Sequence, residues 1–117
     1  CMGARPVHNA MIAYPERFVA GAMWHPSFLT DDTDASPHLT VPDLAGGLYI
    51  GIGTADQVQS IEMHQRYLDA AAACDNITVN VIDGADHGFT WPISPNYHET
   101  GAEQSWTATL DLFERRL

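Results

Sequence analysis

The sequence has few basic side chains and no lysine. Five arginines stand against fifteen Asp and Glu residues, so the formal net charge is −10 at pH 7. A surface with this charge repels nucleic-acid phosphates and anionic lipid headgroups. We therefore expect neither a nucleic acid nor a membrane surface as the partner.

Long apolar runs, signal segments, repeats and disulfide frameworks are also missing. No apolar run has the length of a membrane span, and no charged segment followed by an apolar one marks a signal peptide. The two cysteines, Cys1 and Cys74, do not make a disulfide framework, which favours a reducing, cytoplasmic compartment. The histidines show no metal-ligand spacing and no glycine-rich phosphate loop occurs, so neither a metal nor another cofactor is expected.

What the sequence does contain is typical of one globular domain. Its 117 residues are 45% hydrophobic and include three Trp and four Phe. A chain of this length can bury a core, so we expect residues 1–117 to form a single domain.

The apolar pattern predicts alternating helices and strands. Helices are expected at residues 4–14, 57–74 and 99–117, strands at 18–24, 48–53 and 77–83, and a long loop with one short turn at 25–47. This alternation favours an α/β fold with a parallel sheet covered on both faces. Three strands are few for that architecture and leave two open edges, so the chain resembles half of a sheet.

Two of the predicted helices carry candidate packing faces. In the helix at 57–74, Val58, Ile61, Leu68 and the alanines at 70–73 are available for packing. In the last helix, the stripe of near-helical spacing consists of Trp106, Leu110, Phe113 and Leu117.

Three chemically reactive side chains follow strands or an expected strand position. Cys1 stands where a strand before the first helix would end, Asp56 follows the strand at 48–53, and His87 follows the strand at 77–83. Open parallel sheets bind ligands beyond the carboxyl ends of their strands. Nucleophile, acid and base in this chain order are typical of α/β-hydrolases.

Each residue type suits its role in such a triad. A cysteine attacks as thiolate, which an imidazole and a helix N-terminus would both stabilise at Cys1. Asp56 would hold one tautomer and orientation of the His87 imidazole. The backbone N–H of Met2, the residue after the nucleophile, would donate to the developing oxyanion.

With these motifs the sequence resembles the carboxy-terminal half of the dienelactone hydrolase family, a branch of the α/β-hydrolases. The segments that carry the resemblance are "CMGAR" before a helix, "GTADQ", "GADHGF", "TDDTDASPH" and "AEQSWTATLDLFERRL". Cys1 and Gly3 match the third and fifth positions of the family's G-x-C-x-G elbow, and Asp56 and His87 match its acid and base. The resemblance implies hydrolysis of a carboxylic ester or lactone through an acyl-thioester.

The sequence departs from the family in two ways. The strand before the nucleophile and the loop that supplies a second oxyanion donor are absent. We therefore expect Cys1 to lie within a longer chain rather than at its natural start. We also expect a partner for the open sheet edge, either a missing N-terminal segment or a second copy of the chain. Trp91 replaces the family's arginine four residues after the base, which favours a less anionic small-molecule substrate.

Several residues have alternative interpretations. Cys1 could be the lipid-modified start of a lipoprotein, Asp56 a helix N-cap, and His87 a residue that only stabilises its turn. Asp83 and Asp86 are rival acids, although both are expected to be solvated. His25 and Trp91 are candidate substrate contacts, and a plain loop role for His25 or a packing role for Trp91 remains open.

Overall fold

A three-stranded parallel sheet forms the centre of the computed structural model, which describes all residues from 1 to 117. Its strands lie in the order β1 (Ala20–Trp24), β2 (Gly47–Gly53) and β3 (Ile77–Ile82). In this register Ile50 of the central strand lies between Met23 of β1 and Val79 of β3. The outer sides of β1 and β3 have no strand partner in the chain.

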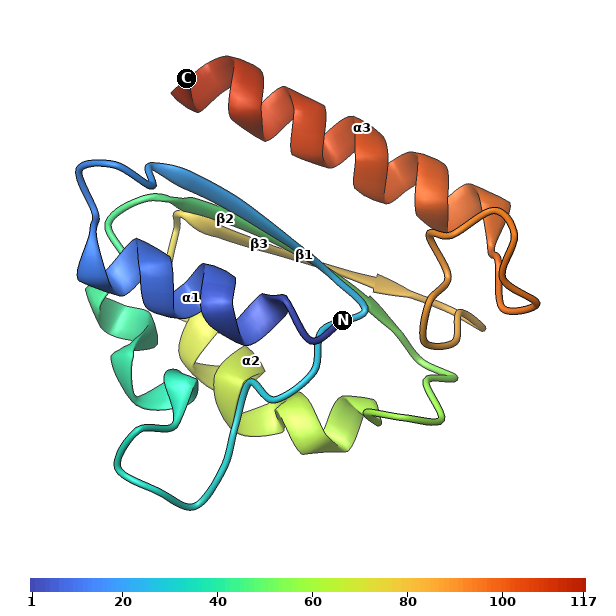
Figure 1. Ribbon diagram of the computed structural model, residues 1–117, viewed down its shortest axis with the longest axis horizontal. Coiled ribbons are helices and arrows are strands. Elements are labelled where there is room, and N and C mark those ends of the chain that lie inside the picture. The colour runs from blue at the N-terminus through green and yellow to red at the C-terminus, as the bar shows by residue number, and fades with distance from the viewer.

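Helices cover both faces of the sheet (Figure 1). On one face lie α1 (Ala4–Ala13) and α2 (Gln65–Ala72), together with two short 3₁₀ helices, η1 (Pro37–Asp43) and η2 (Ile61–His64). On the other face lies the long helix α3 (Glu99–Arg116). The predicted α/β class with a parallel sheet between helices is confirmed.

The central strand explains why the two faces differ. Leu48 and Ile50 alternate with Gly47, Tyr49 and Gly51, and the two aliphatic residues belong to the main core cluster with Met23. A Cβ atom on Gly51 would lie 2.8 Å from the hydroxyl oxygen of Ser105 in α3. The sequence therefore places aliphatic side chains beneath α1 and α2, and glycines on either side of Tyr49 where α3 approaches the strand closely.

The predicted packing face of α3 is wrong. Its buried residues are Gly101, Ser105, Thr109 and Leu112. Trp106, Leu110 and Leu117 are 52%, 49% and 82% exposed. Small hydroxylated residues face the sheet because they fit against its glycines. They also accept hydrogen bonds there, since Trp24 Nε1 donates to Thr109 Oγ1 (3.1 Å) and Tyr49 Oη donates to Ser105 Oγ (3.1 Å).

The predicted helix at 57–74 is also too long. Residues 57–60 are loop, the 3₁₀ turn η2 follows, and α2 spans only Gln65–Ala72. The reason is local, because the Asp56 carboxylate accepts hydrogen bonds from the backbone N–H groups of Val58 and Gln59 and holds them in a turn. Val58 is consequently 60% exposed rather than packed.

The remaining elements differ less from their predicted bounds. The strand expected at 18–24 begins at Ala20, and the one expected at 77–83 ends at Ile82. The long loop at 25–47 contains η1 in place of a single turn. None of the helices has the length and apolar character needed to cross a membrane.

Candidate active site

Cys1 lies where the carboxyl end of β1 meets the beginning of α1. Its nitrogen donates to the carbonyl oxygen of Trp24 (2.7 Å). Its own carbonyl oxygen accepts from the N–H groups of Ala4 (3.2 Å) and Ser27 (3.0 Å). These three hydrogen bonds hold the backbone of Cys1 in place, while the residue as a whole stays exposed to solvent.

Asp56 lies just beyond the carboxyl end of β2 with a fully buried side chain. One carboxylate oxygen, Oδ1, accepts from the N–H groups of Val58 (2.9 Å) and Gln59 (2.8 Å). The other oxygen, Oδ2, lies 2.9 Å from Nδ1 of His87. The turn that follows β2 therefore orients the carboxylate, and leaves one oxygen for the imidazole.

His87 lies in the turn that follows β3, with its ring between the other two side chains. Glycines at 84 and 88 adopt φ values of +78° on either side of it, which only glycine adopts readily. Its Nδ1 is 2.9 Å from Asp56 Oδ2, and its Nε2 is 3.0 Å from the Cys1 sulfur. The structure thus brings Cys1, Asp56 and His87 together at one end of the sheet.

This arrangement can move a proton between sulfur and imidazole. When the Nδ1–H of His87 donates to the Asp56 carboxylate, Nε2 carries the lone pair that faces the thiol. The imidazole can then accept the thiol proton and leave a thiolate on Cys1. The His87 side chain is only 13% exposed, which limits competition from water.

Neither rival acid contacts the imidazole. Asp83 accepts from the hydroxyl group of Thr54 (3.2 Å). Asp86 is half-buried and accepts from two backbone N–H groups, those of Gln57 (2.8 Å) and His87 (2.6 Å). The expectation that Asp86 is solvated is therefore wrong.

The backbone next to the nucleophile offers a free donor. The N–H group of Met2 makes no hydrogen bond within the chain, although it lies directly after Cys1. The Met2 side chain itself is 68% exposed. An N–H group without a partner in the residue after the nucleophile is available to donate to an oxyanion.

His25 packs directly against the ring of His87. The two ring centroids are 5.3 Å apart in an edge-to-face arrangement, and His25 packs in the same way on Phe89 (5.2 Å). Its Nε2 lies 2.9 Å from Thr90 Oγ1, and burial lowers the pKa of His25 to about 4. The ring is therefore neutral at pH 7. It also lines a hollow of about 300 Å³ together with Cys1.

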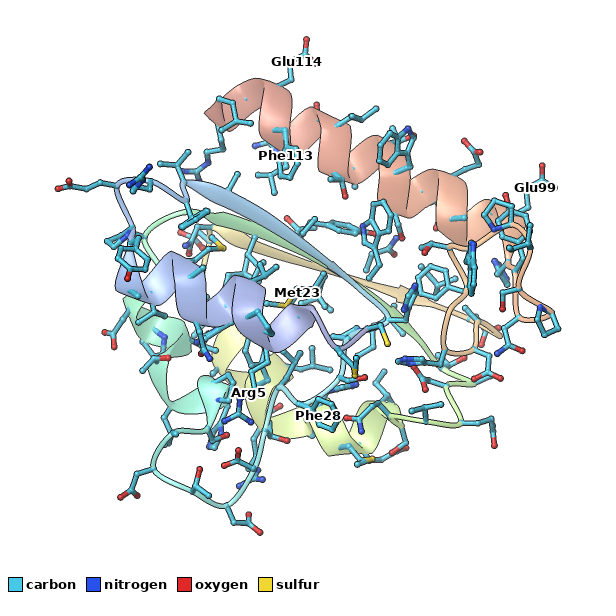
Figure 2. The ribbon with its side chains drawn as sticks, in the orientation of Figure 1. Arg5, Met23, Phe28, Glu99, Phe113 and Glu114 are labelled. Atoms are coloured by element: carbon cyan, nitrogen blue, oxygen red, sulfur yellow. The ribbon has the colours of Figure 1, made fainter.

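Arg5 anchors the loop that carries His25, a role that the sequence analysis missed. Its guanidinium donates to Asp31 Oδ2 (2.7 Å) and to the carbonyl oxygens of Ala35 (3.1 Å) and Phe28 (3.4 Å). Arg5 extends from α1 toward this loop, on which Phe28 lies (Figure 2). Hydrogen bonds from Thr33 and then Arg5 lower the pKa of Asp31 to about 2.

Trp91 lies on the turn after His87, where its N–H donates to the carbonyl oxygen of Gly88 (3.1 Å). Its side chain is 60% exposed, so it is not a core residue. Of the arginines, Arg5 is paired with Asp31 and Arg66 with Asp32 at 3.3 Å. No group of three or more His, Cys, Asp or Glu side chains is arranged so that it could hold a metal ion.

Comparisons with known proteins identify the family of this chain. The family model described as the dienelactone hydrolase family matches residues 1–117. Two relatives, from Salmonella typhi and Salmonella typhimurium, are each called "Putative carboxymethylenebutenolidase" and are 30% identical to this chain over 121 residues. The alignments cover 97% of this chain but only 43% of each relative.

A solved structure shows the same fold. It is a crystal structure of a "Putative Dienelactone Hydrolase" from Klebsiella pneumoniae, which matches with a TM-score of 0.74 and 21% sequence identity. The match covers 89% of this chain and 45% of that one. The chain therefore spans less than half the length of the proteins that it matches here.

Proposed function

The chain belongs to the dienelactone hydrolase family, and we propose that it carries the catalytic triad of an enzyme that hydrolyses a carboxylic ester or lactone. Cys1 is the nucleophile, His87 the base and then the acid, and Asp56 the carboxylate that orients the imidazole. The observation that carries this proposal is the continuous contact from Cys1 Sγ through the His87 ring to Asp56 Oδ2, at 3.0 and 2.9 Å.

The first half of the reaction forms a thioester. The thiol proton of Cys1 passes to Nε2 of His87, and the thiolate attacks the carbonyl carbon of the substrate. The negative charge that develops on the carbonyl oxygen is stabilised by the N–H group of Met2. When the intermediate collapses, the carbon–oxygen bond breaks and the leaving alcohol takes the proton from Nε2.

The second half restores the enzyme. A water molecule gives a proton to Nε2 of His87 and attacks the thioester carbonyl carbon. The carbon–sulfur bond then breaks, the Cys1 sulfur leaves and takes the proton back from Nε2, and a carboxylic acid is released. If the substrate is a lactone, acid and alcohol stay in one molecule, and the product is a hydroxy acid.

Mass spectrometry of a quenched turnover tests the thioester directly. After incubation with p-nitrophenyl acetate and acid quenching, an added acetyl group is expected on the peptide that contains Cys1. The Cys1→Ala variant should carry none. A protein that turns over the ester while only Cys74 carries the acetyl group would contradict the proposal.

His25 and Trp91 are the proposed substrate contacts of this half of the site. His25 lines the hollow next to Cys1, and its ring is neutral at neutral pH. The indole of Trp91 stands where the family has an arginine, so this position offers no cation to a substrate carboxylate. We therefore propose a substrate whose acyl part carries less negative charge than a dienelactone.

The first prediction concerns the reactivity of the two thiols. Iodoacetamide is expected to alkylate Cys1 at least about tenfold faster than Cys74 at pH 7, because the thiolate is the reactive form and His87 can accept the Cys1 proton. Cys74 is half-buried, and its thiol points to the carbonyl oxygen of Ala70 at 3.5 Å. Peptide mapping after timed quenching measures both rates. Equal rates would show that Cys1 is an ordinary cysteine.

A second candidate function follows from the open edge of the sheet. Beside β1, a hollow of about 380 Å³ is lined mainly by apolar residues of α1, β1 and α3, among them Met11 and Phe113, and by Phe18 of the segment before β1. The Cys1 nitrogen bonds to the Trp24 carbonyl oxygen at the end of this strand. We propose that a further strand covers this edge, and that the chain is inactive until a missing N-terminal segment or a second copy provides it.

This second candidate predicts how the 117 residues behave alone. An uncovered edge exposes unpaired backbone groups and apolar surface, and a catalytic site with one oxyanion donor loses on the order of a hundredfold or more in rate. The isolated chain should hydrolyse aryl esters weakly or not at all, and should self-associate. Ester assays combined with sedimentation velocity measure both properties. A fully active monomer would rule out the need for a covering strand.

A further inference from the structure

The turns that carry the acid and the base are joined by hydrogen bonds. Figure 1 shows that the segments following β2 and β3 leave the sheet at the same end. The N–H of Thr54 donates to the carbonyl oxygen of Ile82 (3.1 Å). One step further along, the N–H of Ala55 donates to the carbonyl oxygen of Ala85 (3.0 Å). The parallel pairing of β2 and β3 is thus extended beyond the strands toward Asp56.

The last connection before the catalytic side chains is made by Asp86. Its Oδ1 atom accepts from the N–H of Gln57 (2.8 Å) and from the N–H of His87 (2.6 Å). Gln57 directly follows the acid Asp56, and Asp86 directly precedes the base. A single carboxylate oxygen therefore ties together the backbones next to two members of the triad.

We propose that Asp86 is a positioning residue, which sets the separation of Asp56 and His87 so that the carboxylate and the imidazole stay in hydrogen-bonding contact. This inference rests on the proposed triad. Asp86 has no contact with the imidazole and acts only through the backbone.

The carboxylate of Asp86 can hold backbone N–H groups more strongly than most other side chains could at this position. Hydrogen bonds from N–H groups to a carboxylate are stronger than those between neutral groups. The Asp56 carboxylate already holds the N–H groups of Val58 and Gln59. Because Asp86 accepts from the N–H of Gln57, the N–H groups of residues 57, 58 and 59 all donate to carboxylates. The turn after Asp56 therefore has little freedom to move away from His87.

Variants at this position separate positioning from charge and from stability. Asp86→Ala removes the acceptor, and Asp86→Asn keeps an oxygen acceptor without the charge. Asp86→Glu keeps the charge but moves the carboxylate by one methylene. Asp83→Ala is the matched control, because Asp83 is an exposed acid of the same turn and bonds only to a side chain, that of Thr54. Urea unfolding shows which variants remain folded.

Two readouts report on the triad itself. The first is the rate of Cys1 alkylation by iodoacetamide at pH 7, and the second is the NMR signal of the His87 Nδ1 proton, which shifts downfield when it is hydrogen-bonded to a carboxylate. We expect Asp86→Ala to slow alkylation about tenfold and to weaken the downfield signal, because small displacements at such sites have large effects on rate. Asp86→Glu and Asp86→Asn should each slow alkylation about threefold, whereas Asp83→Ala should stay within twofold of the unchanged protein.

The His87→Gln variant distinguishes two kinds of failure. If His87→Gln alkylates at the unchanged rate, the proposed triad itself is wrong. If His87→Gln is slow but folded Asp86→Ala and Asp86→Glu both match the unchanged protein in rate and in the His87 signal, the triad stands and the role of Asp86 is overturned. If Asp86→Ala does not fold, the Asp86→Glu result alone decides.

Discussion

Replacing Cys1 by alanine or His87 by glutamine is expected to lower kcat for ester hydrolysis by about 10³-fold or more. The alanine variant has no nucleophile, and the glutamine variant has no group that takes the thiol proton and returns it to the leaving alcohol. The measurement is the release of p-nitrophenol by a form of the protein that turns over p-nitrophenyl acetate. Cys74→Ala, which removes the other thiol, is the control and should retain activity.

A double variant strengthens this test. When two residues act on the same step, removing the second causes little further loss of rate. The double variant Cys1→Ala with His87→Gln should therefore be about as slow as either single variant. Asp56→Asn should be slow as well, because an amide cannot stabilise the imidazolium ion. Single variants whose losses multiply in the double variant would show that Cys1 and His87 do not act on the same step.

Mild acid is expected to destabilise the fold well before its carboxylates are protonated. His8 is fully buried between Tyr67 and Thr40, with Nδ1 2.8 Å from the phenol oxygen and Nε2 2.8 Å from the threonine hydroxyl. Burial, and then the charge of Arg5, lower the pKa of His8 from 6.5 to about 4. The unfolded chain therefore binds a proton between about pH 6.5 and pH 4 that the folded chain does not bind.

The sign and size of the effect follow from this difference in protonation. Stability from neutral His8 is fully present above about pH 6.5 and is lost as the pH falls to about 4, by about 2–3 kcal/mol for this residue. Burial also lowers the pKa of His25 to about 4 and the pKa of His64. The Asp31 contribution, with a pKa lowered to about 2, is lost only at lower pH, between about 3.8 and 2.

Urea unfolding between pH 8 and pH 4 measures this loss. The midpoint concentration should fall steadily below pH 6.5, and His8→Gln should fall less steeply although it starts from a lower stability. A midpoint that stays constant from pH 7 to pH 4.5 would contradict the prediction.

The strands and the chain order of the reactive residues follow from the sequence alone. Short apolar runs bounded by polar or glycine residues mark buried strands, and the residues after parallel strands meet at one end of the sheet. This rule made Cys1, Asp56 and His87 candidates, left Asp83 and Asp86 as rival acids, and needed the family resemblance to favour the three residues that lie in contact in the structure. The family resemblance added the activity that we propose.

The packing of the helices could not be predicted in the same way. A helix that contacts a sheet through glycines buries small residues, so the apolar stripe of α3 was a poor guide and Ser105 and Thr109 are buried instead. The start of α2 was misplaced because the Asp56 carboxylate holds residues 57–60 in a turn. The first outcome depends on residues that meet from different elements, and the second on a side chain that binds the backbone of its own turn.

The sequence by itself determined the three strands and the α/β class, because both are encoded by neighbours along the chain, and it named the residues of the candidate triad among other candidates. Only the tertiary structure decided which groups surround the triad: Asp86 between the two turns, the ring of His25 against His87, and Arg5 beneath the loop that carries His25. These contacts join residues that are far apart in sequence, and their geometry depends on how strands and helices pack. The hydrophobic periodicity of a sequence does not predict which residues of different elements will lie in contact.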